Sequence, residues 1–226
     1  MDEETIDAFE LGVKSDWWDR RLRVNAAAFY NDYKDMQLAV FEAGSGGASS
    51  RIVNAGEATY MGLELEVIAL LTDSFTAELS YGYLDAEFDE YNARNPATNQ
   101  IEDISNITTV TRAPENTASL GLQYTFQPTD IGALSARVDF AYTDGYTFHP
   151  FLNRFDSADS RTLVNARLSL DDLAIGNGNS LRLSAWVKNL TDEEYREWGI
   201  DFGSLGFAGA TYGRPRTFGI DAVYNF

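Results

Sequence analysis

Apolar and polar residues alternate with a period of two along most of the 226-residue chain, and the 3.6-residue period of an amphipathic helix is scarce. Successive side chains of a β-strand point to opposite faces, so this alternation predicts strands with one apolar and one polar face. We expect about nine strands, over residues 5–14, 23–30, 61–67, 75–83, 118–126, 134–143, 164–171, 181–188 and 217–226. The pattern therefore predicts an all-β chain.

The length of these stretches favours a membrane barrel over a soluble sandwich, which gives the same alternation. Several stretches exceed the 5–6 residues typical of globular strands, and a tilted transmembrane strand needs about 9–11. Aromatic residues crowd the strand ends, as expected for girdles at the two membrane interfaces. They are Tyr30, Tyr33, Tyr81, Tyr83, Tyr124, Phe126, Tyr142, Tyr224 and Phe226.

The connections between the predicted strands alternate in length. The shorter ones are residues 15–19, 71–74, 127–132 and a Gly/Asn-rich turn at 171–179. The longer ones are a flexible Gly/Ser segment at 44–50 and loops at 92–112, 149–159 and 196–210. Outer-membrane barrels have this asymmetry, with short periplasmic turns and longer extracellular loops.

The odd strand count predicts that the chain is part of something larger. Bacterial single-chain barrels have even strand numbers, and open sheet edges are not tolerated in lipid. If the last strand descends to the periplasm, the first descends too, so the chain begins on the extracellular side. A missed strand and a barrel shared by several chains are the two alternatives.

Composition narrows the classes of partner. The net charge of -18 argues against nucleic acid, because backbone binding depends on Lys and Arg neutralising phosphates. There are no cysteines, so no disulfide framework or thiolate metal site is expected. No apolar run reaches 18 residues, and the beginning lacks the features of a signal peptide, so we expect any export signal upstream.

Six weak motifs in order carry a family resemblance. The first three are Glu10-Leu-Gly-Val-Lys14, then Arg21-Leu-Arg-Val-Asn-Ala-Ala-Ala-Phe-Tyr30 with Asp32-Tyr33, then Asn54-Ala-Gly56 before Gly62-Leu-Glu-Leu-Glu66. The last three are Ala113-Pro114-Glu-Asn-Thr117, then Val187-Lys-Asn-Leu-Thr-Asp192 with Tyr195, then Pro215-Arg216-Thr-Phe-Gly219 leading to Phe226. In this order the chain resembles the C-terminal β-barrel portion of TonB-dependent outer-membrane receptors.

The resemblance implies an antiparallel transmembrane β-barrel of 22 strands, closed inside by an N-terminal plug domain. Residues 1–226 would be a single barrel segment, with the plug and the N-terminal strands absent from this chain. It also implies a Gram-negative outer membrane containing lipopolysaccharide, TonB acting through the plug, barrel-assembly machinery, and no cofactor. The implied function is active uptake of a scarce nutrient, with a ferric siderophore as the commonest substrate.

Two other functions are open. A passive porin or channel would need a complete, even barrel without a plug, and an outer-membrane hydrolase would need a catalytic Ser and His. The hydrolase is weakly supported, because the Ser157, Asp156 and Asp159 that neighbour His149 are common loop residues. We therefore expect no enzyme, no catalytic residue and no metal site.

Candidate ligand-binding residues lie in the predicted extracellular loops, where aromatic surfaces suit sugars and chelates. They are Tyr146, Phe148, His149, Arg154, Phe155 and Trp198, and the alternative is that these side chains only pack the loops together. Acidic residues Asp85, Glu87, Asp89 and Glu90 follow a strand toward the outer rim. They suit either divalent-ion bridges to lipopolysaccharide or, more simply, a solvated rim.

Two further sets complete the predicted site residues. Charged residues on the polar faces should line the lumen or meet the plug, because charges there meet water or protein instead of lipid. They are Glu64, Glu66, Arg137, Asp139, Arg167, Arg182, Lys188 and Asp221. By resemblance, the last strand with its terminal aromatic is read by the assembly machinery, so Tyr224 and Phe226 are expected to serve barrel insertion.

Overall fold

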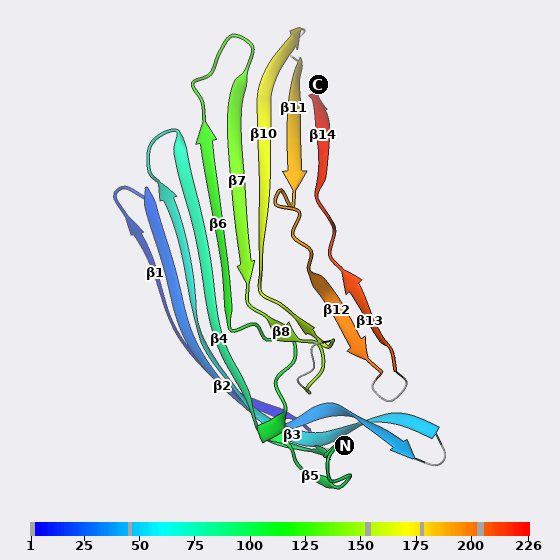
Figure 1. Ribbon diagram of the computed structural model, residues 1–226. Helices are drawn as coiled ribbons and strands as arrows, with labels where there is room; N and C mark the ends of the chain where they lie inside the picture. Colours follow the sequence, from blue (N-terminus) through cyan, green and yellow to red (C-terminus); the bar gives the residue numbers. More distant parts are fainter. Residues whose placement is uncertain (1–2, 45–46, 152–154, 177–178, 203–205) are drawn as a thin grey trace.

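The computed structural model describes residues 3–44, 47–151, 155–176, 179–202 and 206–226, which form a curved antiparallel sheet (Figure 1). Along the sheet, nine strands lie in sequence order: β1 (Thr5–Trp17), β2 (Leu22–Gly44), β3 (Gly47–Leu70), β4 (Phe75–Arg94), β6 (Asn116–Thr125), β7 (Ala133–Thr143), β10 (Arg161–Gly176), β11 (Asn179–Lys188) and β14 (Thr217–Asn225). These nine strands match the nine that the alternation predicts, so the all-β fold is confirmed. The sheet is open, and β1 and β14 form its edges.

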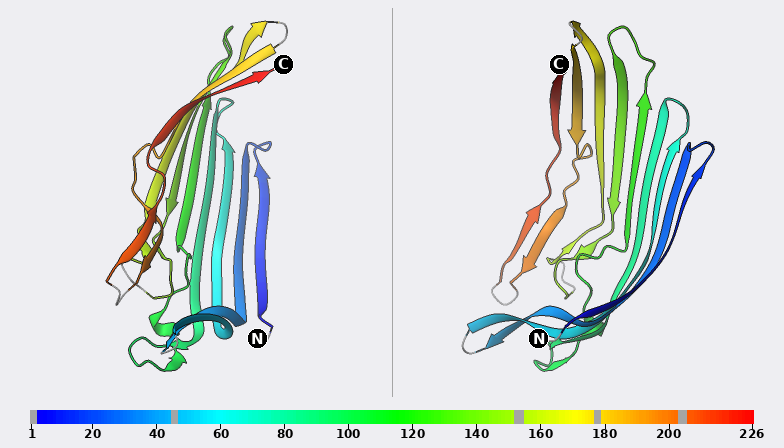
Figure 2. Two further views of the ribbon diagram at one scale, coloured as in Figure 1. Left: turned by 90° about the vertical axis from the view of Figure 1, so that its right-hand side faces the viewer. Right: turned by 180° about the vertical axis from the view of Figure 1, so that it is seen from behind.

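The connections separate into two ends of the sheet (Figure 2). The short turns β1–β2, β3–β4, β6–β7 and β10–β11 lie at one end, which we call the short-turn end. The other connections lie opposite, at the long-connection end, together with the beginning of the chain. Because the number of strands is odd, β1 and β14 run in the same direction, from the long-connection end to the short-turn end.

The long connections contain ordered elements that the sequence reading treated as loops. Residues 92–112 include β5 (Ile101–Asp103), which pairs with β4, and the short 3-10 helix η1 (Ser105–Ile107). Residues 196–210 include most of the hairpin of β12 (Arg196–Asp201) and β13 (Ala208–Tyr212). Between β7 and β10, β8 (Tyr146–Thr147) pairs with β9 (Ser157–Ala158).

Two predicted connections are wrong in extent. In the Gly/Ser segment 44–50, Gly44 and residues 47–50 belong to paired strands. The pairing of β2 with β3 continues from the pair Leu38 and Val53 to the pair Gly44 and Gly47. The turn expected at 171–179 is shorter, because β10 reaches Gly176 and β11 begins at Asn179. Ladder hydrogen bonds join backbone groups and need no apolar face, so pairing continues where the alternation fades.

The strand register places the apolar positions on one continuous face. Leu122, Val138, Ala166, Val187 and Phe218 occupy consecutive strands in direct register. Toward the edges this face is open, and Leu11 and Ile220 are each 81% exposed. The opposite face carries polar and charged side chains. A sheet with an uncovered apolar face is suited to contact lipid on that side.

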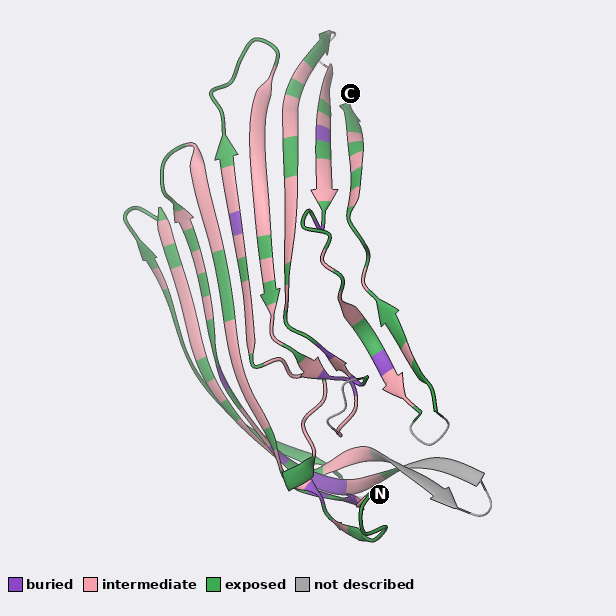
Figure 3. Ribbon diagram, viewed as in Figure 1, coloured by how far each residue is buried: buried purple, intermediate pink, exposed green. Residues whose placement is uncertain are grey.

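Most buried side chains lie at the long-connection end, although Ser184 is buried within β11 (Figure 3). Ala55, Tyr91, Ala93 and Ile104 form a small core, packed against Leu38, Val53, Phe88 and Phe151. This core joins β3, β4 and the segment after β5. Within the described residues, no helix is long and apolar enough to cross a membrane.

Candidate functional site

The predicted ligand residues that the structure describes lie together at the long-connection end. At β8 and directly after it, the rings of Tyr146 and Phe148 meet edge to face, with centroids 5.5 Å apart. The ring of His149 meets that of Trp198 on β12 in the same geometry, at 6.3 Å. Phe148 is only 6% exposed. We call Tyr146, Phe148, His149, Phe155 and Trp198 the aromatic loop cluster; Arg154 lies outside the described residues.

Backbone and charged groups join the loops that carry this cluster. The N–H of Asp201 on β12 donates to the carboxylate Oδ1 of Asp156 at 2.5 Å, and the N–H of Phe148 donates to the carbonyl of Asp156 at 2.7 Å. The Arg161 guanidinium lies between the rings of Tyr146 and Tyr195, 5.7 and 4.9 Å from their centroids. These contacts fix the β7–β10 and β11–β14 connections to each other, and part of the aromatic cluster serves this packing.

The groups around His149 do not form a catalytic triad in the described residues. His149 Nε2 is buried without a hydrogen-bond partner, and the Asp156 carboxylate accepts a backbone N–H. A triad needs a His that bonds a nucleophile on one side and an acid on the other. In the part of the chain that the structure describes, no group of three His, Asp or Glu residues is arranged to hold a metal ion.

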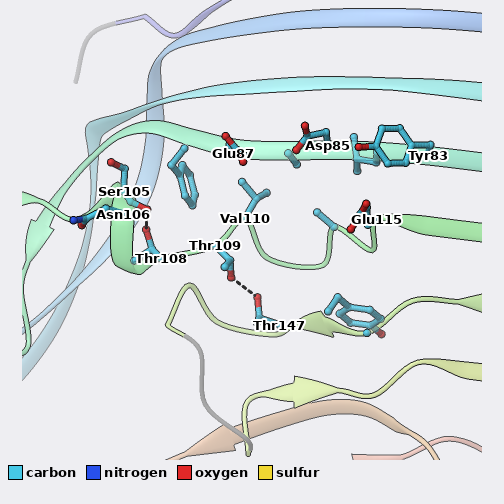
Figure 4. A pocket seen from close by; sticks show the side chains of 16 residues that line it. Tyr83, Asp85, Glu87, Ser105, Asn106, Thr108, Thr109, Val110, Glu115 and Thr147 are labelled. Atoms are coloured by element: carbon cyan, nitrogen blue, oxygen red, sulfur yellow. Dashed lines mark hydrogen bonds between the residues drawn. The ribbon is translucent and has the colours of Figure 1, made fainter.

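A second feature of this end is an open cleft of about 740 Å³ beside β4 (Figure 4). Its lining comes from residues 83–88 of β4, from the segment 105–115, and from residues 145–147. The hydroxyls of Thr109 and Thr147 lie 3.0 Å apart on its far side. Three carboxylates, those of Asp85, Glu87 and Glu115, belong to the lining. Sequence reasoning placed Asp85 and Glu87 on the rim and missed the cleft, because segment 105–115 has no periodic pattern.

The other two acidic residues of the rim, Asp89 and Glu90, accept hydrogen bonds from neighbouring side chains. The Asp89 carboxylate accepts a hydrogen bond from the Thr59 hydroxyl at 2.8 Å, and Glu90 accepts one from the Asn92 amide. Nearby, the Asp103 carboxylate accepts the backbone N–H groups of Tyr91 and Ser105, both at 3.0 Å. These two hydrogen bonds lower the pKa of Asp103 below its ordinary value of 3.8.

The motif around Asn189 has a structural explanation. Asn189 has a φ of 52°, is 5% exposed, and follows the end of β11. Its side-chain amide donates to the carbonyls of Glu193 and Arg214 at 2.9 and 3.2 Å, and its side-chain oxygen accepts the Glu193 N–H at 2.8 Å. One side chain thus closes its own turn and joins it to the connection that leads into β14.

Further along the same motif, Asp192 and Tyr195 strengthen this join. Asp192 accepts the Arg216 backbone N–H at 2.9 Å and lies 3.6 Å from the Arg216 guanidinium. Gly213 lies against Tyr195 so closely that a Cβ there would overlap the ring. The motif Asn116 acts similarly at the start of β6, where its N–H and side-chain amide both donate to the Asp144 carboxylate, at 2.9 and 2.7 Å.

The eight charged residues that were predicted to line a lumen share the polar face. The Arg137 guanidinium lies 2.8 Å from both Glu78 and Asp139, and Arg167 lies 3.1 Å from Asp221. Arg182 pairs with Asp171, Lys188 lies over the Trp186 ring, and Glu66 accepts the Asn25 amide. The register puts Glu64 on this face too, opposite Ala27 and Gly82. That this face borders a lumen or plug stays a prediction.

The two predicted assembly residues lie at the end of the free edge strand. Phe226 is fully exposed and Tyr224 is 50% exposed, and their rings stack with centroids 6.0 Å apart. Nothing in the described residues covers them. Their role in insertion stays a prediction.

A curved antiparallel sheet of long strands, apolar on one face and polar on the other, defines the class of protein as a β-barrel wall. A family model described as "TonB dependent receptor-like, beta-barrel" matches residues 1–190, and the chain belongs to this family. The resemblance seen in the six sequence motifs is thereby confirmed.

The related proteins are receptors and transporters by name. The chain is 30% identical over 190 residues to the ferrichrome outer membrane transporter/phage receptor of Escherichia coli K12, covering 83% of this chain and 22% of that protein. It is 27% identical over 200 residues to the probable TonB-dependent siderophore receptor PiuA of Acinetobacter baumannii, covering 86% and 24%. It thus spans less than a quarter of each.

A solved structure shares the fold across the chain. The ferric yersiniabactin uptake receptor FyuA from Yersinia pestis superposes with a TM-score of 0.75 at 23% identity, over 99% of this chain and 30% of that chain. At this identity the likeness establishes the fold alone.

Proposed function

We propose that the chain is a barrel-wall segment of an outer-membrane TonB-dependent receptor that imports a scarce nutrient, a ferric siderophore first among the candidates. The observation that carries the proposal is the family match over residues 1–190, which contains eight of the nine strands of the sheet, all except β14. The name of the PiuA relative includes a siderophore, and that of the E. coli relative includes ferrichrome.

In this proposal the apolar face meets the lipid of a Gram-negative outer membrane and the long-connection end faces outward, toward lipopolysaccharide. The paired charges of the polar face then line the lumen and meet a plug domain through which TonB acts. Most of the arginines on this face already have carboxylate partners, so the wall can remain hydrated or contact protein without uncompensated cations. Charges on the lipid side would cost about 2–4 kcal/mol each near the midplane.

The aromatic loop cluster is the proposed contact for the substrate, since its external position suits a chelate that arrives from outside. Phe155 and Trp198 are its most accessible members, at 38% and 36% exposed, whereas Phe148 is buried and holds the loops together. Flat aromatic rings with polar edges bind the apolar and polar surfaces of a chelate at low entropic cost.

Uptake of iron-55 ferrichrome by cells that produce the protein and lack other ferrichrome receptors tests this proposal. We expect uptake that stops when a protonophore removes the inner-membrane potential. Trp198→Ala should reduce uptake, while the matched Phe207→Ala, whose ring packs on Phe202 outside the cluster, should not. Uptake that continues without the potential would indicate a passive channel. Absence of uptake for every ferric chelate offered would contradict the proposal.

A further inference from the structure

The edge of β4 that faces β6 is unpaired over part of its length. The β4–β6 ladder ends at Tyr83–Asn116, followed by one hydrogen bond from the Leu84 N–H to the Glu115 carbonyl at 2.8 Å. Pairing with β5 begins only at Asn92. On its other edge β4 remains paired with β3 throughout this stretch, as far as Gly56–Tyr91. Residues 85–90 of β4 therefore have a single strand neighbour among the described residues.

The orientation of the free backbone groups follows from the ladder. In an antiparallel pair, alternate residues direct both N–H and C=O to the same neighbour. Because the Leu84 N–H points to Glu115, the backbone groups of Ala86 and Phe88 point to the same side. Among the described residues, neither forms a backbone hydrogen bond on this edge. Two donors and two acceptors therefore face the cleft.

The opposite side of the cleft is formed by segment 105–115, and part of this segment is hydrogen-bonded to other loops. Residues 109–112, which lead toward β6, bond to the connection between β7 and β10 instead of to β4. The Thr109 N–H donates to the Pro150 carbonyl at 2.8 Å, and the Arg112 N–H donates to the Thr147 carbonyl at 2.9 Å. The cleft of about 740 Å³ lies between β4 and this segment (Figure 4).

The charge of the cleft has one sign. Asp85, Glu87 and Glu115 line it, and none of its lining residues is Lys or Arg. Within the described residues, none of these three carboxylates forms an ion pair. A ligand that matches this surface carries positive charge and alternating backbone donors and acceptors.

We propose that the cleft binds a basic peptide in extended conformation, which adds a strand to β4 along Asp85–Asp89. Five residues at about 3.4 Å each give a contact roughly 17 Å long. Main-chain hydrogen bonds to Ala86 and Phe88 supply affinity, as in other cases of strand addition, and Lys or Arg side chains meet the carboxylates. This binding is separate from nutrient uptake and does not depend on it.

The test measures binding of the peptide acetyl-Lys-Val-Lys-Val-Lys-amide to the protein purified from outer membranes in detergent, by isothermal titration calorimetry at low salt. Its matched peptides are the Glu-Val-Glu-Val-Glu analogue and a lysine peptide with alternate backbone nitrogens methylated. We expect the lysine peptide to bind and both analogues to lose about tenfold or more in affinity, since two or more backbone bonds or the charge match are lost.

Variants of the cleft provide the second half of the test. Ala86→Pro removes the N–H that faces the cleft and leaves the β3 edge intact, because Ala86 directs no backbone group toward β3. It should weaken the lysine peptide about tenfold, whereas Ala86→Ser should not. Glu87→Gln with Glu115→Gln should reduce both affinity and its salt dependence.

Equal binding of the methylated and unmethylated peptides, or no binding of the lysine peptide, would overturn the proposal. The methylated peptide acts on the unaltered protein, so this outcome remains decisive even if Ala86→Pro does not fold.

Discussion

Asn189 shows how much of this fold depends on one side chain. It has a left-handed backbone, it is almost fully buried, and its amide closes a turn and reaches the connection before β14. Asn and Gly adopt this backbone most easily, and only Asn also supplies the amide. Sequence reading found the motif and attributed it to a family; the structure supplies its physical cause.

At this position we expect Asn189→Ala to lower the free energy of unfolding by about 2–4 kcal/mol, because three hydrogen bonds are lost and a left-handed backbone is left without relief. Asn189→Gly should cost about 1 kcal/mol less, since glycine removes only the strain. Urea unfolding in lipid vesicles measures both. Equal effects of the two variants would show that the backbone conformation contributes nothing.

Asp103 makes the stability of its loop depend on pH. Two backbone N–H groups lower its pKa in the folded state, so its contribution to stability is complete above its unfolded value of 3.8 and is lost as the pH falls through the folded value. We expect the Tyr91 and Ser105 amides to exchange with solvent faster once the pH passes below that range, beyond the intrinsic change. Asp103→Asn should abolish this extra acceleration, which hydrogen exchange followed by NMR can detect.

The strands are the elements that the sequence predicts best. The features that it does not predict depend on contacts between segments far apart in the chain. Side-chain alternation located all nine strands, because each must keep one apolar face. It did not extend β2 and β3 to Gly44 and Gly47, where pairing rests on the backbone alone. The cleft beside β4 was equally invisible, since it depends on the partners of segment 105–115. The aromatic loop residues were located as a set, but their pairing into Tyr146–Phe148 and His149–Trp198 required the structure.

The two faces of one strand give a matched comparison at this scale. Leu65 lies on the apolar face in register with Ala26 and Tyr81, and its neighbour Glu66 lies on the polar face. Leu65→Lys should destabilise the membrane-inserted protein by about 2–4 kcal/mol, as a lipid-facing charge does near the midplane. Glu66→Lys should cost clearly less. The folded fraction in vesicles, read from heat-dependent gel mobility, measures both; similar losses would contradict the assignment of the faces.

For the molecule as a whole, variants of the last strand can separate an effect on assembly in the membrane from an effect on stability. Phe218 lies on the free edge strand β14 and Phe226 directly follows it, and they are 82% and 100% exposed. If Phe226 is read by the assembly machinery, Phe226→Ala lowers the amount of folded protein in the outer membrane while leaving unfolding of the purified protein unchanged. Phe218→Ala serves as the control. Equal membrane levels for the two variants would remove the assembly role.

The common direction of β1 and β14 restricts how copies of this chain could ever share one ring. Copies related by rotation about the barrel axis all point the same way, so β14 of one copy and β1 of the next would meet as parallel strands. Each junction would then need the slanted hydrogen bonds of a parallel ladder inside a wall that is otherwise antiparallel. An antiparallel closure instead requires a different stretch of polypeptide with an odd number of strands between the two edges.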